Sequence, residues 1–292
     1  MAARSTDPFT LPPIDEKTGG RVQVSFSGGR TSAYMLHRLI AANDGLPDDR
    51  VEVVFANTGR EREATLAFVA EVAHRWGLMI TWVEGRPQAP GFEVVGYQGA
   101  ARAGEPFEAL IRKKRYLPNQ QARFCTSELK VRAARDYLRS VSWTYWTAAI
   151  GIRADEPHRT GKADLRERWT RWTPLVDAEV TRRDVARFWQ AQPFDLELGH
   201  VDGRCSEGNC DGCFLKSEAA LAALHRDRPS RSAWWEEMEE VASGLTSNPN
   251  GARFSKRYSR ASLNRFVEKQ RDWIFDAKGS LCQAAGGECA PY

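Results

Sequence analysis

The chain has 292 residues, 42% of them hydrophobic and 27% charged, which are ordinary values for a globular protein. With 42 Lys and Arg residues against 38 Asp and Glu residues, the net charge of +4 is mild. No apolar run approaches the roughly 20 residues that cross a bilayer, and the N-terminal segment lacks the apolar core of a signal peptide. These properties argue against a membrane protein and predict a cytoplasmic location.

Strand-like and helix-like segments alternate through the first half of the chain. The apolar patterns predict strands over 22–26, 51–56, 79–83 and 145–151, and helices over 31–42, 63–76, 105–115 and 127–140. Such alternation predicts an α/β fold, a parallel twisted sheet with helices on both faces. Because ligands of these folds bind at the carboxyl ends of the strands, the loops after the expected strands are candidate sites.

The second half of the chain is less regular. Residues 169–175 end in a proline turn, and Thr181 and Asp184 form a capping-box pattern for a helix that reaches Ala191. A loop rich in Gly and Cys follows at 199–213. Further helices are expected near 217–226, 231–243 and 261–275, before a tail of small residues that we expect to be mobile. The predicted organisation is a flexible N-terminal segment (1–20), an α/β domain (21–198), and a helical extension packed on the same domain (199–292).

The segment SFSGGRTS, residues 25–32, joins the first expected strand to the first expected helix. Its two glycines allow the backbone to approach a ligand and to adopt positive φ. Successive N–H groups at the start of a helix bind anions, and the hydroxyls of Ser27, Thr31 and Ser32 add donors. The segment matches neither the Walker A loop nor G-x-G-x-x-G. It predicts an anion site, and the alternative is a plain Gly-Gly turn.

Further motifs follow in a specific order. They are SGGRTS (27–32), NTGRE (57–61), RFCTSELKV (123–131), GIRADE (151–156), WTPL (172–175) and GNCDGC (208–213). Together, from about residue 21 to about 217, they resemble the PAPS reductase-like branch of the PP-loop adenine nucleotide alpha hydrolases, the ATP pyrophosphatase superfamily. The resemblance implies a Rossmann-type α/β fold that binds an adenine nucleotide, with its phosphates over the first loop.

The resemblance also assigns candidate roles to residues at matching positions. The nucleotide-binding candidates are Ser25, Ser27, Gly28, Gly29, Arg30, Thr31, Ser32, Asn57, Thr58, Gly59 and Gly151. Lys130 and Arg153 are the catalytic candidates, since each would bring positive charge to phosphates or sulfate. Alternatively, Lys130 is an ordinary exposed helix residue and Arg153 is the ion-pair partner of a loop.

The chain has six cysteines, and in a reducing compartment a group of thiols indicates metal or redox chemistry. The spacing Cys210-x-x-Cys213 suits two thiolates on one metal or cluster. With Cys125 and Cys205 the set could hold zinc or a 4Fe–4S cluster, and the resemblance favours the cluster. APS reductases carry a Cys-Cys pair where this chain has Phe124-Cys125, so Cys205 would replace the missing ligand.

A second arrangement uses three cysteines. Cys125, Cys210 and Cys213 would hold the cluster with its fourth iron open, as in some tRNA-thiolating relatives of the superfamily. Near the C-terminus, Glu288-Cys289 resembles the E-C-G tail of sulfonucleotide reductases, but the residues that follow depart from that pattern. For Cys289, as for Cys282, an inert tail thiol is the favoured interpretation.

The favoured function is that of an ATP pyrophosphatase. With MgATP it would adenylate an acceptor, a nucleic acid or a nucleotide, and sulfur would then displace the AMP, as in tRNA thiolation or DNA phosphorothioation. A cysteine desulfurase would donate the sulfur. The intact S-G-G-x-x-S favours this function, although Thr31 stands where many such enzymes have Asp.

Two alternatives remain. The first is an APS/PAPS (sulfonucleotide) reductase that releases sulfite, with Cys289 as its nucleophile. Reductases tend to have a degenerate loop, which argues against it here. The second is a nucleic-acid-binding subunit with a structural cluster, in which the tryptophans of 143–189 would stack on bases. Tryptophans in such a pattern more often belong to the core.

Overall fold

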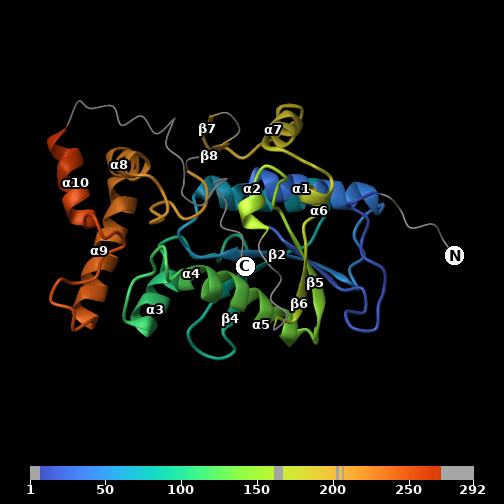
Figure 1. Cartoon of the computed structure of the whole chain (residues 1–292), viewed down its shortest axis with the longest axis horizontal. Coiled ribbons are helices and arrows are strands. Elements are labelled where there is room, and N and C mark those ends of the chain that lie inside the picture. Colours follow the sequence, from blue (N-terminus) through green and yellow to red (C-terminus); the bar gives the residue numbers. More distant parts are fainter. Residues whose placement is uncertain (1–6, 161–166, 202–203, 206, 271–292) are drawn as a thin grey trace.

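A six-stranded sheet forms the centre of the structure (Figure 1). The computed structural model describes residues 7–160, 167–201, 204–205 and 207–270. The strands are β1 (Val22–Ser25), β2 (Val51–Asn57), β3 (Ile80–Gly85), β4 (Phe92–Val95), β5 (Trp146–Ile150) and β6 (Trp169–Trp172). Their order is β4-β3-β2-β1-β5-β6, and every neighbouring pair is parallel except β3 and β4. This is the predicted α/β fold with a mainly parallel sheet.

The position of β1 in the sheet determines where a ligand can bind. Ser25, the last residue of β1, is in register with Val54 of β2 on one side and with Ile150 of β5 on the other. The chain leaves β1 toward β2 and returns to its other side only with β5, so the strand order reverses between β1 and β5. Parallel sheets bind their ligands outside the carboxyl ends of the strands at such a reversal.

Helices cover both faces of the sheet (Figure 1). On one face lie α1 (Arg30–Ala42), α2 (Glu63–Trp76) and α7 (Arg182–Gln190), which share the largest hydrophobic cluster with the sheet. On the other face lie α4 (Phe124–Thr126), the π-helical turn η1 (Ser127–Arg132) and α5 (Ala133–Ser140). Alternate residues of β2 point to opposite faces, so Val53 packs in the first cluster and Val54 packs against α5.

The C-terminal helices extend the molecule at one end (Figure 1). They are α8 (Glu218–Asp227), α9 (Pro229–Leu245) and α10 (Arg260–Lys269); α8 and α9 share a hydrophobic cluster with α3 (Glu105–Lys114), and α10 packs on α8 and α9. Phe107 of α3 meets Trp235 of α9 edge to face, with ring centroids 5.6 Å apart. Short elements complete the described chain: the turn η2 (Pro157–Arg159), α6 (Pro174–Asp177), and the hairpin β7 (His200–Val201) and β8 (Arg204–Cys205). Among the described helices, none is both long enough and apolar enough to span a membrane.

Most predicted elements are present, with shifts of one or two residues; the helix expected near 261–275 is α10 (Arg260–Lys269), and residues 271–275 of that prediction lie outside the described residues. The helix predicted over 127–140 begins as a π-helical turn, and 169–175 divides into β6 and α6. The sequence did not indicate β4 or the short hairpin. The capping box at Thr181 is confirmed, since Asp184 accepts hydrogen bonds from both the N–H and the hydroxyl of Thr181.

Two expectations about packing have clear outcomes. Residues 7–20, expected as part of a flexible lead-in, pack on the core: Phe9 is fully buried, and Asn43 donates to its carbonyl over 3.0 Å. The tryptophans of 143–189 belong to the core rather than to a stacking surface. Trp143, Trp146 and Trp189 are buried, and the ring of the half-buried Trp169 stacks on Trp146.

Candidate functional site

The loop after β1 forms a cradle at the start of α1. Gly28 has φ +74°, and a Cβ at this position would lie 2.8 Å from Cγ2 of Thr65 and 3.0 Å from Cγ2 of Val69. Only glycine meets both conditions. Gly29 precedes α1, no side chain caps the helix, and its first turn contains no acidic residue. The positive end of the helix dipole therefore faces this loop, which suits an anion.

Two serine hydroxyls hold the loop in shape. Ser32 Oγ accepts a hydrogen bond from the N–H of Ser27 over 3.2 Å, lies 2.9 Å from Ser27 Oγ, and donates to the carbonyl of Gly29 over 3.0 Å. Ser32 is buried, while Ser27 is half-buried. Ser32 thus positions the backbone of the cradle, and Ser27 is the hydroxyl of the pair that lies nearer to solvent.

The segment after β5 lies against the first turn of α1. A Cβ on Gly151 would lie 3.2 Å from Cα of Ser32, so a larger residue would push the two segments apart. The buried Arg153 donates from Nη1 to Thr31 Oγ1 over 3.1 Å and from Nε to Asp155 Oδ1 over 2.8 Å. Arg153 therefore lies beside the cradle and also pairs with a loop carboxylate, as the ion-pair interpretation expected; its catalytic role stays a prediction.

Two predicted binding residues are engaged elsewhere. The Arg30 side chain forms an ion pair with Asp195, with 2.6 Å between Nε and Oδ1, and its carbonyl accepts a hydrogen bond from Trp189 Nε1. Ser25 Oγ accepts a hydrogen bond from Gln23 Nε2, which lies on the α5 face of the sheet. Neither side chain gathers with the loop, because a strand and a helix each point successive side chains in different directions.

The loop after β2 is fixed by buried polar contacts. Asn57 donates from Nδ2 to Glu84 Oε1 over 2.7 Å and to the carbonyl of Ala101, and its Oδ1 accepts from the N–H of Gly59. Gly59 has φ +79°, and a Cβ there would lie 3.0 Å from Cα of Gly104. Asn57 and Gly59 thus shape the loop and join it to the end of β3.

Thr58 connects this loop to the cysteine region. Its N–H and hydroxyl both donate to the carboxylate of Glu61, at 2.9 and 2.8 Å, and its Oγ1 lies 3.3 Å from Cys210 Sγ. Lys130, on the π-helical turn η1, places Nζ 3.7 Å from Glu61 Oε1. Glu61 therefore contacts both Thr58 and Lys130, while Cys210 lies against Thr58; the sequence alone did not indicate a role for Glu61.

Asp211, between the two cysteines of the motif, is the buried centre of a second network. It accepts hydrogen bonds from Arg60 Nη2 at 3.0 Å and from Trp235 Nε1 at 2.8 Å, and it forms a short ion pair with Arg231. The pKa of Arg60 is lowered by burial, an effect opposed by the charges of Asp211 and Cys210. This network could not be predicted from the sequence, because α9 and the loop after β2 supply its members from distant parts of the chain.

The four candidate cysteines divide into two groups. Cys125 and Cys210 pack against the cluster between α3 and α9, and Cys210 also packs with Cys213. Cys205 packs against the main core instead, where burial raises the pKa of its thiol. Over residues 7–160, 167–201, 204–205 and 207–270, no three His, Cys, Asp or Glu side chains form a group that could hold a metal ion. Cys125, Cys210 and Cys213 thus lie in neighbouring hydrophobic clusters apart from Cys205, without forming a metal-binding group of three among the described residues. Cys282 and Cys289 lie outside the described residues.

Comparisons with known proteins identify a matching family model and two similar phage proteins. Residues 21–196 match the model of the phosphoadenosine phosphosulfate reductase domain, a span that ends just before the Cys loop. The nin region protein ORF290 of Escherichia phage lambda is 33% identical over 218 residues, which cover 70% of this chain and 69% of the phage protein. A 37.8 kDa protein from the gpa 5′ region of Escherichia phage 186 is 23% identical, over 88% of both chains.

Proposed function

The chain belongs to the phosphoadenosine phosphosulfate reductase domain family, and from this premise we propose that it is an ATP pyrophosphatase that adenylates an acceptor for sulfur transfer. An oxygen of the acceptor attacks the α-phosphorus of MgATP, the bond to the β-phosphate oxygen breaks, and pyrophosphate leaves. A sulfur nucleophile then displaces AMP from the activated acceptor. We propose a nucleic acid or a nucleotide as the acceptor and a cysteine desulfurase as the sulfur source.

The observation that carries the proposal is the open N-terminus of α1 beneath an intact loop. No side chain caps this helix, and its first turn lacks an acidic residue. The leaving pyrophosphate is a polyanion, and fixed N–H donors at a helix N-terminus stabilise such charge without reorganising during the reaction. An enzyme that only cleaves a bond to sulfur, with no pyrophosphate leaving, has less need of the whole cradle.

Arg153 and Lys130 support the same reaction from two sides. Arg153 contacts Thr31 in the first turn of α1, and Lys130 lies beside Glu61 under the loop after β2. Positive charge on both sides would stabilise the charge that develops on the transferred phosphoryl group. Each cation already has a carboxylate neighbour, Asp155 and Glu61 respectively, which would hold its side chain in place before the nucleotide binds.

We propose that Cys125, Cys210 and Cys213 hold a 4Fe–4S cluster. Their soft donors suit iron–sulfur chemistry, and Cys210 packs both with Cys213 and against the hydrophobic cluster that Cys125 also contacts. Such a cluster would supply a site for binding or steering sulfur. The chain's own residues nearby are Thr58, which lies next to Cys210, and the cation Lys130.

The test is a calorimetric titration of the anaerobically purified protein with MgATP, APS and PAPS. Tight binding of MgATP and weak binding of both sulfonucleotides is the expected result. Arg153→Ala should weaken MgATP binding at least tenfold, since a buried charged hydrogen bond is lost. Arg187→Ala, a change at an exposed arginine of α7, is the matched control and should leave binding unchanged.

A sulfonucleotide reductase is the second candidate, and the description of the matching family model favours it. Preference for APS or PAPS over MgATP, with sulfite as the product, would contradict the adenylating function and establish the reductase. Its proposed nucleophile, Cys289, would then be the residue to substitute.

A further inference from the structure

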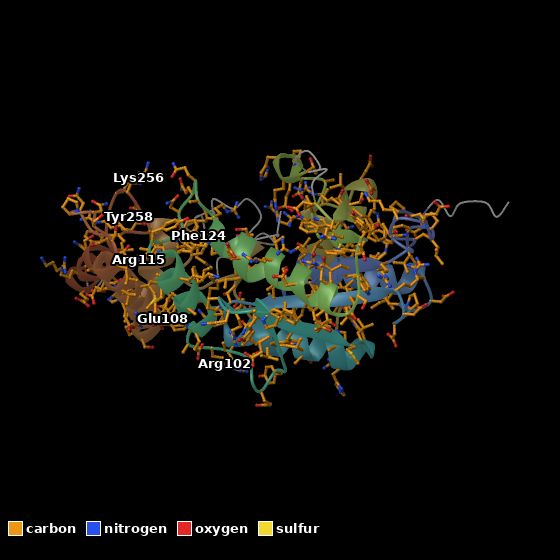
Figure 2. All side chains as sticks on the ribbon, turned by 90° about the horizontal axis from the view of Figure 1, so that it is seen from below. Arg102, Glu108, Arg115, Phe124, Lys256 and Tyr258 are labelled. Atoms are coloured by element: carbon orange, nitrogen blue, oxygen red, sulfur yellow. The ribbon has the colours of Figure 1, made fainter. Side chains whose placement is uncertain are left out.

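A basic cleft of about 800 Å³ lies beside the C-terminal helices, away from the loop after β1. One wall is the loop that precedes Cys125, residues 119–121. The other walls are residues 214–221, which run from the turn after Cys213 into α8, and residues 248–260, which run from the segment after α9 to the first residue of α10. Lys256 and Tyr258 lie together at this end of the molecule (Figure 2). The cleft is thus bounded by segments that lie next to Cys125 and Cys213 in the sequence.

Positive charge dominates the cleft. Its lining contains five basic residues and one acidic residue, Glu218; the basic ones are Lys216, Arg253, Lys256, Arg257 and Arg260. Arg253 and Lys256 are exposed at the rim, and Arg257 forms an ion pair with Glu218 at 2.9 Å. The two buried cations donate to main-chain carbonyls, Lys216 to Gly208 at 2.9 Å and Arg260 to Gly212 at 2.7 Å. The excess of positive charge predicts a polyanionic ligand.

Aromatic rings and amides line the same cleft. Phe214 is half-buried and stacks on Phe254 with an angle of 7° between the rings, and Tyr258 is also half-buried. Gln120 and Gln121 are exposed on the facing wall. Single-strand recognition combines three features: cations that follow the nucleic-acid backbone, partly open rings that stack on bases, and amides that reach base edges.

We propose that this cleft binds a single-stranded stretch of nucleic acid. A cleft of this volume is within the range of about 300–1,000 Å³ that accommodates small ligands. It suits unstacked nucleotides, whereas a base-paired helix keeps its base faces covered. The salt dependence of binding should show contacts between phosphates and the rim cations.

The cleft shares a wall with the cysteine loop. Arg260 lines the cleft and donates to the carbonyl of Gly212, the residue before Cys213. On another side of the same loop, Cys210 contacts Thr58. A nucleotide in the cleft would therefore lie against the loop that also meets the candidate ATP site. The idea that this nucleic acid is the acceptor rests on the proposed function. The binding of single strands in the cleft does not rest on it.

The experiment measures fluorescence anisotropy of labelled 20-nucleotide single strands of DNA and RNA, and of a DNA duplex, without ATP and across a salt series. The full-length protein should prefer a single strand to the duplex. Arg253→Ala with Lys256→Ala should weaken binding at least tenfold and reduce the slope of log affinity against log salt by about 1.4, since two phosphate contacts are lost. Tyr258→Ala should weaken binding roughly tenfold without changing that slope.

Arg183→Ala with Arg187→Ala removes two exposed arginines of α7 and is the matched control, which should bind like the unsubstituted protein. Equal losses in both double variants, or unchanged binding in the cleft variant, would overturn the proposal. Equal competition by a poly-glutamate peptide would also overturn it, since the cleft would then select charge alone. If the cleft binds single strands but the protein fails to bind MgATP, the proposed function fails and this inference stands.

Discussion

Asp211 and Arg60 form a buried ion pair, with 3.0 Å between Oδ2 and Nη2, across 151 residues of sequence. Both side chains are almost fully excluded from solvent. The guanidinium of Arg60 also lies over the ring of Trp234, 4.5 Å from its centroid. This pair joins the loop after β2, the cysteine loop and α9 into one unit.

Asp211→Ala should destabilise the protein by about 3–5 kcal/mol, because it leaves buried arginine charge without a partner. Chemical denaturation with urea would measure the change. Asp227→Ala is the matched control, since it breaks the exposed pair with Arg226 and should cost no more than about 1 kcal/mol. Similar losses of unfolding free energy in the two variants would show that the buried Asp211 pair contributes no more to stability than the exposed Asp227 pair.

Gly28→Ala should impair both the fold and nucleotide binding. The substitution combines a positive φ with a contact of 2.8 Å to Thr65 Cγ2. Gly19→Ala provides the control, since Gly19 has φ +62° and open space around its Cβ position. It should cost about 1–2 kcal/mol of backbone strain only and leave MgATP affinity unchanged. Unaltered MgATP binding by a folded Gly28→Ala variant would argue against the cradle.

Glu52 should make stability fall as the pH rises. Burial raises its pKa, more than hydrogen bonds from Tyr137 and Thr81 lower it. Because the folded pKa lies above the unfolded one, the stabilising contribution is present below the unfolded pKa and is lost as the pH rises through the folded pKa. Glu52→Gln should therefore match the parent protein near pH 4 and exceed its stability near pH 7.

Glu63 should make the stability of the protein change with pH in the opposite direction. Its hydrogen bond from Arg102 holds the pKa of Glu63 below its usual range, so its contribution is present at neutral pH and lost as the pH falls through the folded pKa. Glu63→Gln should be slightly destabilised at neutral pH, since the side chain is 56% exposed and screened by water. Urea denaturation at several pH values tests both variants. If the stability of each variant relative to the parent protein changed with pH in the same direction, the pKa directions given for Glu52 and Glu63 would be refuted.

Serine substitutions of the cysteines test the three-thiolate centre. Cys125→Ser, Cys210→Ser and Cys213→Ser should each lose iron and the visible absorbance of the anaerobic protein. Cys205→Ser should keep both, because Cys205 packs against the main core rather than with Cys210. Loss of iron in all four variants would restore the four-cysteine arrangement. An iron-free parent protein would remove the cluster from the proposal.

Much of the sheet could be predicted because its strands are local signals. β1, β2 and β5 are apolar runs bounded by polar or glycine residues, and each starts and ends within two residues of its predicted position. β4 was missed because only its pairing with β3 makes it a strand: its sequence, FEVV, is short, and most of it lies near solvent. Edge strands depend on a neighbour that sequence periodicity does not reveal.

The candidate site could be predicted at its loops but not at its connections. The glycines of the first loop and the Cys-x-x-Cys spacing are short patterns with a physical reason. Glu61 and Asp211, which join Thr58, Lys130, the cysteine loop and α9, gave no such signal. In the sequence, Glu61 and Asp211 cannot be distinguished from exposed acidic residues, because only the tertiary fold buries them.

The position of Asp211 between the two cysteines has a consequence for how the thiols are presented. The cysteine loop is held at its middle, because Arg60, Arg231 and Trp235 all contact Asp211. The conformational entropy of ordering this loop is therefore met by folding and not by a bound metal. Removal of any metal that these cysteines bind should therefore leave the loop folded, in contrast to small metal-dependent domains that unfold when chelators remove their ion.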